Sequence, residues 1–157
     1  MKLNLLALFF LFMVSCTSDA SNSLETEAIK SKYKVGQVWK FKSRSIEPNA
    51  KLTIIKVESQ GKLGNIIHIH VDSVKIKTSS KPVKYTHVVS HMPFSEAVID
   101  SSVTKMIGEV TELPDFQEGY DEWHESFKKG KAGVFSIPVG KSVEYMETTT
   151  LEGNVVK

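Results

Sequence analysis

Two histidines on a predicted strand are the residues of this chain whose spacing points most directly to chemistry. Residues 66–71, IIHIHV, alternate so that His68 and His70 fall on one face. Their backbones lie roughly 6–7 Å apart, and two imidazoles at that separation can chelate a metal such as zinc. His91 or His87 on another strand could supply a third ligand. The alternative is a polar strand face that carries histidines without a metal, because no HExxH motif or cysteine pair accompanies them.

A predicted amphipathic helix over residues 116–129 holds the second group of candidates. Its aromatic residues recur at spacings of four, three and four from Phe116 onward, which is typical of a helix with one apolar side. Tyr120, Trp123 and His124 are the candidate binding residues on this helix. The acidic residues beside them could do acid–base chemistry only if a cleft raised one pKa, and a solvated face is the alternative.

The rest of the chain carries no complete catalytic or cofactor motif. GxSxG, GxGxxG and a complete phosphate loop are all missing from the sequence. The chain has 20 basic and 18 acidic residues, so removal of Lys2 with residues 1–15 leaves 19 against 18, a net charge of +1. A charge this small gives no strong field to attract nucleic acid.

The first sixteen residues, MKLNLLALFFLFMVSC, indicate where the protein is sent. Residues 5–14 form an apolar run that is shorter than the roughly 20 residues a membrane-spanning helix needs. The run ends at Met13-Val14-Ser15-Cys16, which is similar to the lipobox of bacterial lipoproteins and contains the only cysteine of the chain. The resemblance implies attachment of diacylglycerol to the Cys16 thiol, removal of residues 1–15 and acylation of the new amino group.

Two alternatives to lipidation stay open at this point. Cleavage after Ala20 would secrete the domain, and residues 1–15 could instead remain as an uncleaved anchor. Lipidation accounts for a lone cysteine in an exported protein, and two or more acyl chains anchor a protein stably. In lipoproteins of double-membraned bacteria, Asp directly after the lipidated cysteine is the usual mark for retention in the inner membrane. Thr17 stands at that position here, which by analogy favours the outer membrane, facing the periplasm. Residues 16–32 are predicted to be the lipidated cysteine and a flexible tether, because they are largely small and polar.

Residues 33–157 are predicted to form a single α+β domain. The first half predicts strands, and a change of apolar parity near residues 72–73 requires a bulge there. The second half predicts helices, one of them opened by Pro138. We expect an antiparallel sheet of about four to five strands with C-terminal helices packed on one face. The predicted strands span 38–42, 52–57, 66–71, 83–92 and 134–137, and the predicted helices span 96–107, 116–129 and the residues after 138.

The core resembles a family of small bacterial proteins of uncharacterised function over about residues 34–147. The resemblance implies one domain and no particular activity, cofactor or partner. It is carried by VGQVW at 35–39, IIHI at 66–69, HMPF at 91–94, LPDF at 113–116 with Gly119, Tyr120 and Trp123, and GKAGVF at 130–135.

Together these observations predict a lipid-anchored accessory or binding module of the cell envelope, without catalytic activity and without a cofactor. Its expected partners are the membrane, through Cys16, and a protein of the envelope, with no nucleic acid. By similarity of layout, one specific version is an immunity lipoprotein that captures a toxic effector in the periplasm. The alternative function is a metal-binding protein or metal-dependent hydrolase that uses His68, His70 and His91.

Overall fold

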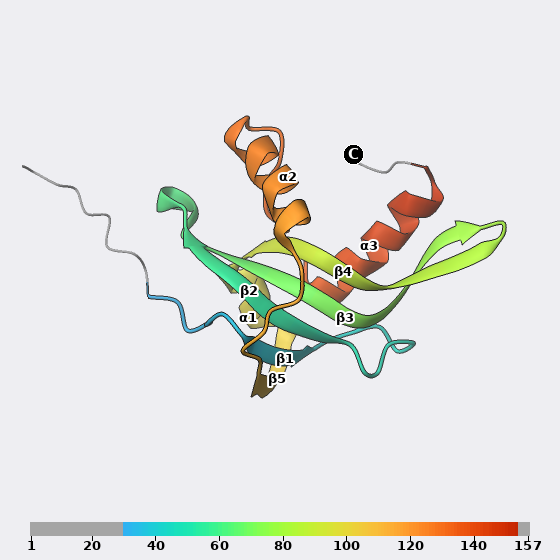
Figure 1. Ribbon diagram of the computed structural model, residues 1–157, viewed down its shortest axis with the longest axis horizontal. Coiled ribbons are helices and arrows are strands. Elements are labelled where there is room, and N and C mark those ends of the chain that lie inside the picture. Colours follow the sequence, from blue (N-terminus) through green and yellow to red (C-terminus); the bar gives the residue numbers. More distant parts are fainter. Residues whose placement is uncertain (1–29, 154–157) are drawn as a thin grey trace, which may run out of the picture.

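A single antiparallel sheet organises the protein. The computed structural model describes residues 30–153, and within them the strands lie in the order β4-β3-β2-β1-β5 (Figure 1). Every pair of neighbouring strands is antiparallel. The predicted α+β class with an antiparallel sheet of four to five strands is therefore confirmed. The strands are β1 (Gln37–Phe41), β2 (Lys51–Ser59), β3 (Asn65–Ser80), β4 (Val83–Ser95) and β5 (Val103–Glu109), with a short 3-10 helix, η1 (Gly61–Leu63), between β2 and β3.

Strand β3 carries two different sets of side chains on its two faces. Ile67 and Ile69 point into a large apolar core, on the side we call the aliphatic face. His68 and His70 alternate with them and lie on the opposite side, the histidine face. The apolar parity then reverses near Ser73, which has a φ of 60° and lies where the pairing with β4 shifts register. The predicted change of parity at residues 72–73 is confirmed.

The three α-helices of the described chain cover both faces of the sheet. On the aliphatic face, Ile99 of α1 (Glu96–Ser102) and Val143 of α3 (Val139–Leu151) join the apolar core. Helix α2 (Gln117–Lys128) instead packs on the histidine face, and Figure 1 shows it on the opposite side of the sheet from α3. Helices α1 and α3 therefore share the aliphatic face, as expected for C-terminal helices packed on one face, and α2 covers the other face.

The predicted helix over residues 96–107 ends early and continues as a strand. Helix α1 stops at Ser102, and β5 begins at Val103. The cause is pairing with β1, because β5 forms antiparallel pairs with Gln37–Phe41 along the free edge of that strand. The predicted strand over residues 134–137 is reduced to a single parallel bridge between Phe94 and Phe135.

The connection between β5 and α2 crosses the histidine face, and we call residues 110–116 the strap. Figure 1 shows it passing in front of β1 and β2 on its way to α2. Its start is fixed because the Val110 N–H donates to the Gly36 carbonyl at 2.8 Å. Gly36 has a φ of +91°, and a Cβ there would lie 2.5 Å from the Val110 oxygen. Only glycine therefore fits beneath the start of the strap.

An ionic hub fixes the loop between β1 and β2. Arg44 Nε donates to Glu47 at 2.9 Å, and Arg44 Nη1 donates to Glu147 of α3 at 2.9 Å. Glu47 is only 2% exposed and also accepts from the Lys75 N–H. Burial raises the pKa of Glu47, but the hydrogen bonds from Arg44 and Lys75 outweigh it and lower that pKa. The hub ties this loop to α3 and to β3.

The N-terminal edge of the described chain is fixed at Tyr33. This residue is 2% exposed, and its hydroxyl donates to Asp100 of α1 at 2.7 Å. Tyr33 is the first buried residue in the described range, and Ser31 and Lys32 just before it already bond to Glu96 of α1. Within residues 30–153 no helix has the length and apolar character needed to cross a membrane.

Candidate functional site

His68 and His91 lie side by side beneath helix α2. Nδ1 of His68 is 2.8 Å from Nε2 of His91, and the two rings are stacked with their centroids 5.1 Å apart. His68 is completely buried on β3, whereas His91 on the neighbouring strand β4 is half-buried. The alternation of the two strands therefore brings together two of the three histidines that the sequence singled out.

Glu58 and Tyr120 extend this pair into a row of hydrogen bonds. Nε2 of His68 lies 3.2 Å from Glu58 Oε1, and the Tyr120 hydroxyl donates to Glu58 Oε2 at 2.9 Å. Because a carboxylate only accepts, neutral His68 must carry its proton on Nε2. Its Nδ1 then accepts from the Nε2–H of His91. We call these four side chains the histidine row.

Burial keeps both histidines of the row neutral. It lowers the pKa of His68 from 6.5 to about 4, and the charges of Lys56 and His124 act in the same direction. The pKa of His91 also falls to about 4, first through burial and then through His68. The contact of His68 with the carboxylate is therefore a hydrogen bond between a neutral donor and an anion at pH 7. Burial and the bond to Glu58 raise the pKa of Tyr120 to about 12, so its hydroxyl keeps its proton.

Aromatic rings of α2 close over the histidine row. The His68 ring meets Trp123 and Tyr120 edge-on, with centroid distances of 4.9 and 5.3 Å. The Trp123 Nε1–H donates to the Gly133 carbonyl at 2.8 Å, which ties α2 to the chain that follows it. His124 stacks on Tyr120 at 5.3 Å. These rings exclude water from the buried polar groups and strengthen their hydrogen bonds.

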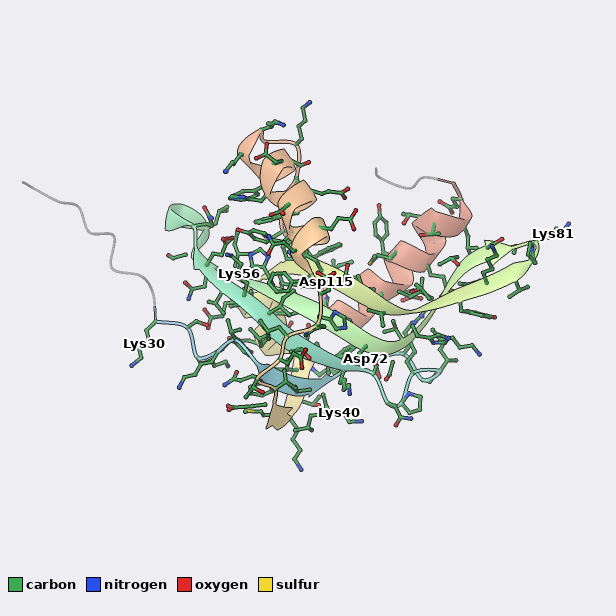
Figure 2. All side chains as sticks on the ribbon, viewed as in Figure 1. Lys30, Lys40, Lys56, Asp72, Lys81 and Asp115 are labelled. Carbon is green, nitrogen blue, oxygen red and sulfur yellow. The ribbon has the colours of Figure 1, made fainter. Side chains whose placement is uncertain are left out.

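Lys56 closes one edge of this cluster. Its Nζ lies 4.5 Å from the centroid of the Tyr120 ring and 4.0 Å from Glu58 Oε2. Figure 2 labels Lys56 on β2 and Asp115 in the strap just before α2. An ammonium placed over a ring and beside a carboxylate balances the one negative charge of the row.

The close approach of α2 to the sheet depends on a glycine in the helix. A Cβ at Gly119 would lie 3.0 Å from the Cβ of His91 and 3.5 Å from Ser90 Oγ. Glycine in a helix interior costs roughly 0.5–1 kcal/mol relative to alanine. That cost is offset here because the helix comes near enough for Trp123 and Tyr120 to reach the buried histidine.

The three histidines of the predicted metal site are not gathered at one point. His68 and His91 bond directly to each other, and the second nitrogen of His68 is taken by Glu58. His70 lies farther along β3, under the strap. Among residues 30–153, no group of three or more His, Cys, Asp and Glu side chains is placed to hold a metal ion. The geometry therefore does not support chelation by His68, His70 and His91 together.

The predicted binding residues of α2 face the sheet. Tyr120 is 8% exposed and Trp123 is 9% exposed, because their stripe covers the histidine row. In this structure the two side chains hold α2 on the sheet and leave little of their own surface for a partner, so their role in binding stays a prediction. His124, at the edge of the cluster, is half-buried.

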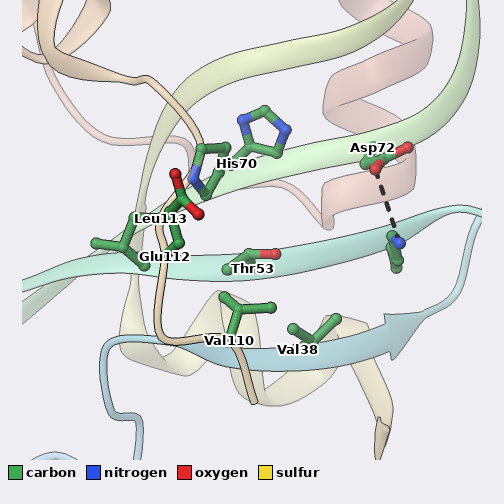
Figure 3. A pocket seen from close by; sticks show the side chains of 9 residues that line it. Val38, Thr53, His70, Asp72, Val110, Glu112 and Leu113 are labelled. Atoms are coloured by element: carbon green, nitrogen blue, oxygen red, sulfur yellow. Dashed lines mark ion pairs between the residues drawn. The ribbon is translucent and has the colours of Figure 1, made fainter. Parts of the chain in front are cut away.

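A cavity of about 400 Å³ lies between the strap and the histidine face. The sheet contributes Thr53, His70 and an ion pair, in which Lys51 Nζ lies 3.7 Å from Asp72 Oδ2. Figure 3 shows Glu112 reaching from the strap toward the strand that carries His70. The remaining lining is apolar and comes from Val38, Val110, Leu113 and Pro114. This volume and mixture of surfaces suit a small ligand.

His70 is the unusual group of this strap cavity. It is 8% exposed, yet its Nδ1 has no hydrogen-bond partner among the described residues. Burial lowers its pKa, while the Ser90 backbone and Asp72 partly oppose this. Nearly all buried polar atoms in proteins are hydrogen-bonded, so an unpaired nitrogen at this position marks the cavity as a candidate ligand site.

The strap cavity was missed by reasoning from the sequence. Glu112 and Thr53 belong to no motif and lie far apart in the chain, and the strap brings them together only after β5 has paired with β1. One signal could have located part of the cavity. Thr53 and His70 are polar residues that pair across β2 and β3, and a predicted register of these two strands would have placed them side by side.

Comparison of the chain with protein-family models, with curated proteins and with solved structures finds no match. Cys16, the predicted lipidation site, lies outside the described residues.

Proposed function

We propose that this protein is a lipid-anchored binding module of the bacterial cell envelope that acts without catalysis. The observation that carries the proposal is the sequence Met13-Val14-Ser15-Cys16 after an apolar run too short to span a membrane. Lipid on Cys16 would hold the domain at the outer membrane, facing the periplasm. The contacts of Ser31, Lys32 and Tyr33 with α1 support this arrangement, because they attach the chain to the domain about fifteen residues after Cys16.

The chemistry of the two candidate sites favours binding over catalysis. The polar atoms of the histidine row hydrogen-bond to one another, and burial keeps both of its histidines neutral. The strap cavity instead contains the buried Nδ1 of His70, which has no partner among the described residues, the Glu112 carboxylate, which pairs with no described cation, and apolar walls. These are features that select a ligand and that need no attacking group. A specific version of the proposal is an immunity-like protein that captures a toxic effector.

The test separates anchoring from binding. Palmitate labelling and intact mass of the purified protein should show a chain that starts at Cys16 and carries acyl groups. The Cys16→Ala variant should lose the label and leave the membrane fraction, while a Ser15→Ala control, which keeps a small residue before the cysteine, should retain both. A mature chain that starts at Ser21 without acyl mass would refute the anchor.

Binding by the domain is tested independently of the lipid. Crosslinking in intact cells followed by purification should recover one envelope protein with the wild type and with the Cys16→Ala variant. Turnover of an ester, peptide or glycoside substrate, abolished by one substitution in the domain, would instead show an enzyme. Elemental analysis of protein purified without a metal-affinity tag checks the metal-binding alternative, which predicts close to one equivalent of metal that His68→Ala removes.

A further inference from the structure

The strap cavity contains a hydrogen-bond acceptor that the protein itself does not use. The Ser90 backbone raises the pKa of His70, as a carbonyl that accepts from the imidazole does. Since Nδ1 has no partner, the proton facing that carbonyl belongs to Nε2. Burial keeps the ring neutral, so Nδ1 holds a lone pair that no described group of the protein uses, in a residue that lines the cavity. A ligand that satisfies this atom must bring a donor.

The charges that line the cavity favour a cationic donor. Lys51 and Asp72 form an ion pair and balance each other. Glu112 lines the same cavity, and it makes no ion pair or hydrogen bond with any residue of the described range. Glu112 is exposed, so the lining holds one solvated carboxylate that no described cation of the protein pairs with. A neutral acceptor and a free carboxylate together form a site for a group that is both positively charged and rich in N–H donors.

The walls limit what can carry that cation. Val38, Val110, Leu113 and Pro114 supply apolar surface, and the cavity of about 400 Å³ accepts a body of a few heavy atoms. Thr53 adds a hydroxyl from β2 that makes no hydrogen bond to other described residues. A short aliphatic chain or a single sugar ring would satisfy these surfaces.

We propose that the strap cavity binds a primary ammonium group on a short aliphatic or sugar body. The ammonium donates to Nδ1 of His70, and the Glu112 carboxylate balances its charge. This inference deepens the proposed binding function by naming the chemical class of ligand at one site. Two sources share this chemistry: the lysine side chain of a protein partner, and an amino sugar of the envelope.

Entry of the ligand requires the strap to move. Nδ1 of His70 is covered in the structure, so a covering group must move before an ammonium can reach the nitrogen, and we expect the strap residues that line the same cavity to be that group. The start of the strap is fixed at Gly36, which confines the movement to the residues around Glu112 and Leu113. Binding should therefore change the environment of the strap amides as well as that of the imidazole.

The experiment titrates n-butylammonium chloride into ¹⁵N-labelled mature protein that carries its own anchor in detergent micelles. Saturable shifts of the His70 imidazole nitrogens and of the amides of residues 110–113 are expected, with a Kd of about 1–10 mM. Equimolar n-butanol and sodium butyrate share the body without the cation, and they should give no saturable shift. Equal shifts from butyrate, or none from butylammonium by about 100 mM, would overturn the proposal.

Variants locate the site. Glu112→Gln and His70→Phe should each weaken butylammonium binding about tenfold, and their amide spectra report whether the fold is kept. Glu109→Gln, which removes an exposed carboxylate on β5 outside the cavity, should leave the Kd unchanged. An unchanged Kd in a folded Glu112→Gln protein contradicts the assignment. N-acetyl-lysine methylamide and glucosamine distinguish the sources, because the tighter of the two identifies the body that the walls prefer.

Failure of this proposal and failure of the proposed function give different results. Loss of acylation on Cys16 would leave ammonium binding intact, because the cavity is built from residues 38–114. Conversely, a butylammonium titration without saturable shifts, in a protein that is acylated on Cys16 and captures a protein partner, would reject only the ammonium site.

Discussion

Nδ1 of His68 lies 2.8 Å from Nε2 of His91, and this hydrogen bond joins β3 to β4 directly beneath α2. One of the two rings is completely buried. A polar contact of this kind adds stability only while every member keeps its partner, because a lone buried donor or acceptor costs about 1–3 kcal/mol. The row therefore fixes the position of α2 more specifically than an apolar contact would.

Replacement of His68 should be strongly destabilising. His68→Leu keeps a side chain of moderate volume but leaves Glu58 and His91 without their partner, so the free energy of unfolding should fall by about 2–4 kcal/mol. Urea denaturation followed by tryptophan fluorescence measures the loss, since Trp123 reports on α2. His87→Leu is the matched control at an exposed position, and its effect should stay within about 1 kcal/mol. Equal losses for the two variants would contradict the role of the row.

Stability should decline as the pH falls from about 6.5 toward 4. The folded pKa values of His68 and His91 are about 4, below the ordinary 6.5, so the unfolded chain binds more protons in this interval. The free energy of unfolding should drop by up to about 1.4 kcal/mol per pH unit for His68, and by less for the more exposed His91 because solvent screens it. Urea midpoints measured at intervals of half a pH unit test this. His91→Gln, whose amide can still donate to His68, should give a shallower slope, and an unchanged slope would exclude His91 as a contributor.

The hub around Arg44 should behave as a buried ion pair. Arg44→Ala leaves the buried Glu47 carboxylate without its cation, and a loss of about 3–5 kcal/mol is expected. The double variant Arg44→Ala/Glu47→Gln should recover part of that loss, because a neutral amide can still accept from the Lys75 N–H. Thermal and urea unfolding report both values. The exposed pair Lys141–Glu144 provides the comparison, and Lys141→Ala should cost less than about 1 kcal/mol.

The start of the strap should not tolerate a side chain. Gly36→Ala places a Cβ 2.5 Å from the Val110 oxygen at a φ of +91°, so we expect a loss of about 2–3 kcal/mol and faster hydrogen exchange of the Val110 amide. Gly108→Ala lies on the neighbouring strand β5 with nothing within 4 Å of the added carbon, and it should be neutral or slightly stabilising. Similar stabilities for the two variants would show that the strap does not depend on Gly36.

Local patterns were sufficient to predict most of the sheet. The alternation of residues 66–71 correctly separates the apolar Ile67 and Ile69 from His68 and His70, because a strand with two covered faces must keep its period of two. The reversal at Ser73 was visible for the same reason. The stripe of aromatic residues also located α2 to within a residue or two.

Non-local pairing explains what the sequence could not predict. Val103 to Ile107 fits one side of a helix as well as it fits a strand, and only the open edge of β1 decides in favour of β5. Likewise, the stripe of α2 says that one side is buried without saying which face of the sheet buries it. The histidine row and the strap cavity depend on these two outcomes, so the sequence could single out the histidines and Tyr120 but not their partner Glu58 or the cavity residue Glu112.

Strand β3 forms a wall shared by two interiors, and this limits how the chain can change in length. Insertion or deletion of one residue within 66–71 would turn His68 and His70 into the aliphatic core and move Ile67 and Ile69 beneath α2 and the strap. Both interiors would be damaged by a single event that alters no side chain. The number of residues in this stretch is thus under stricter constraint than their identity, and length variation between related chains should be confined to the segment beyond Ser73, where the bulge already reverses the parity.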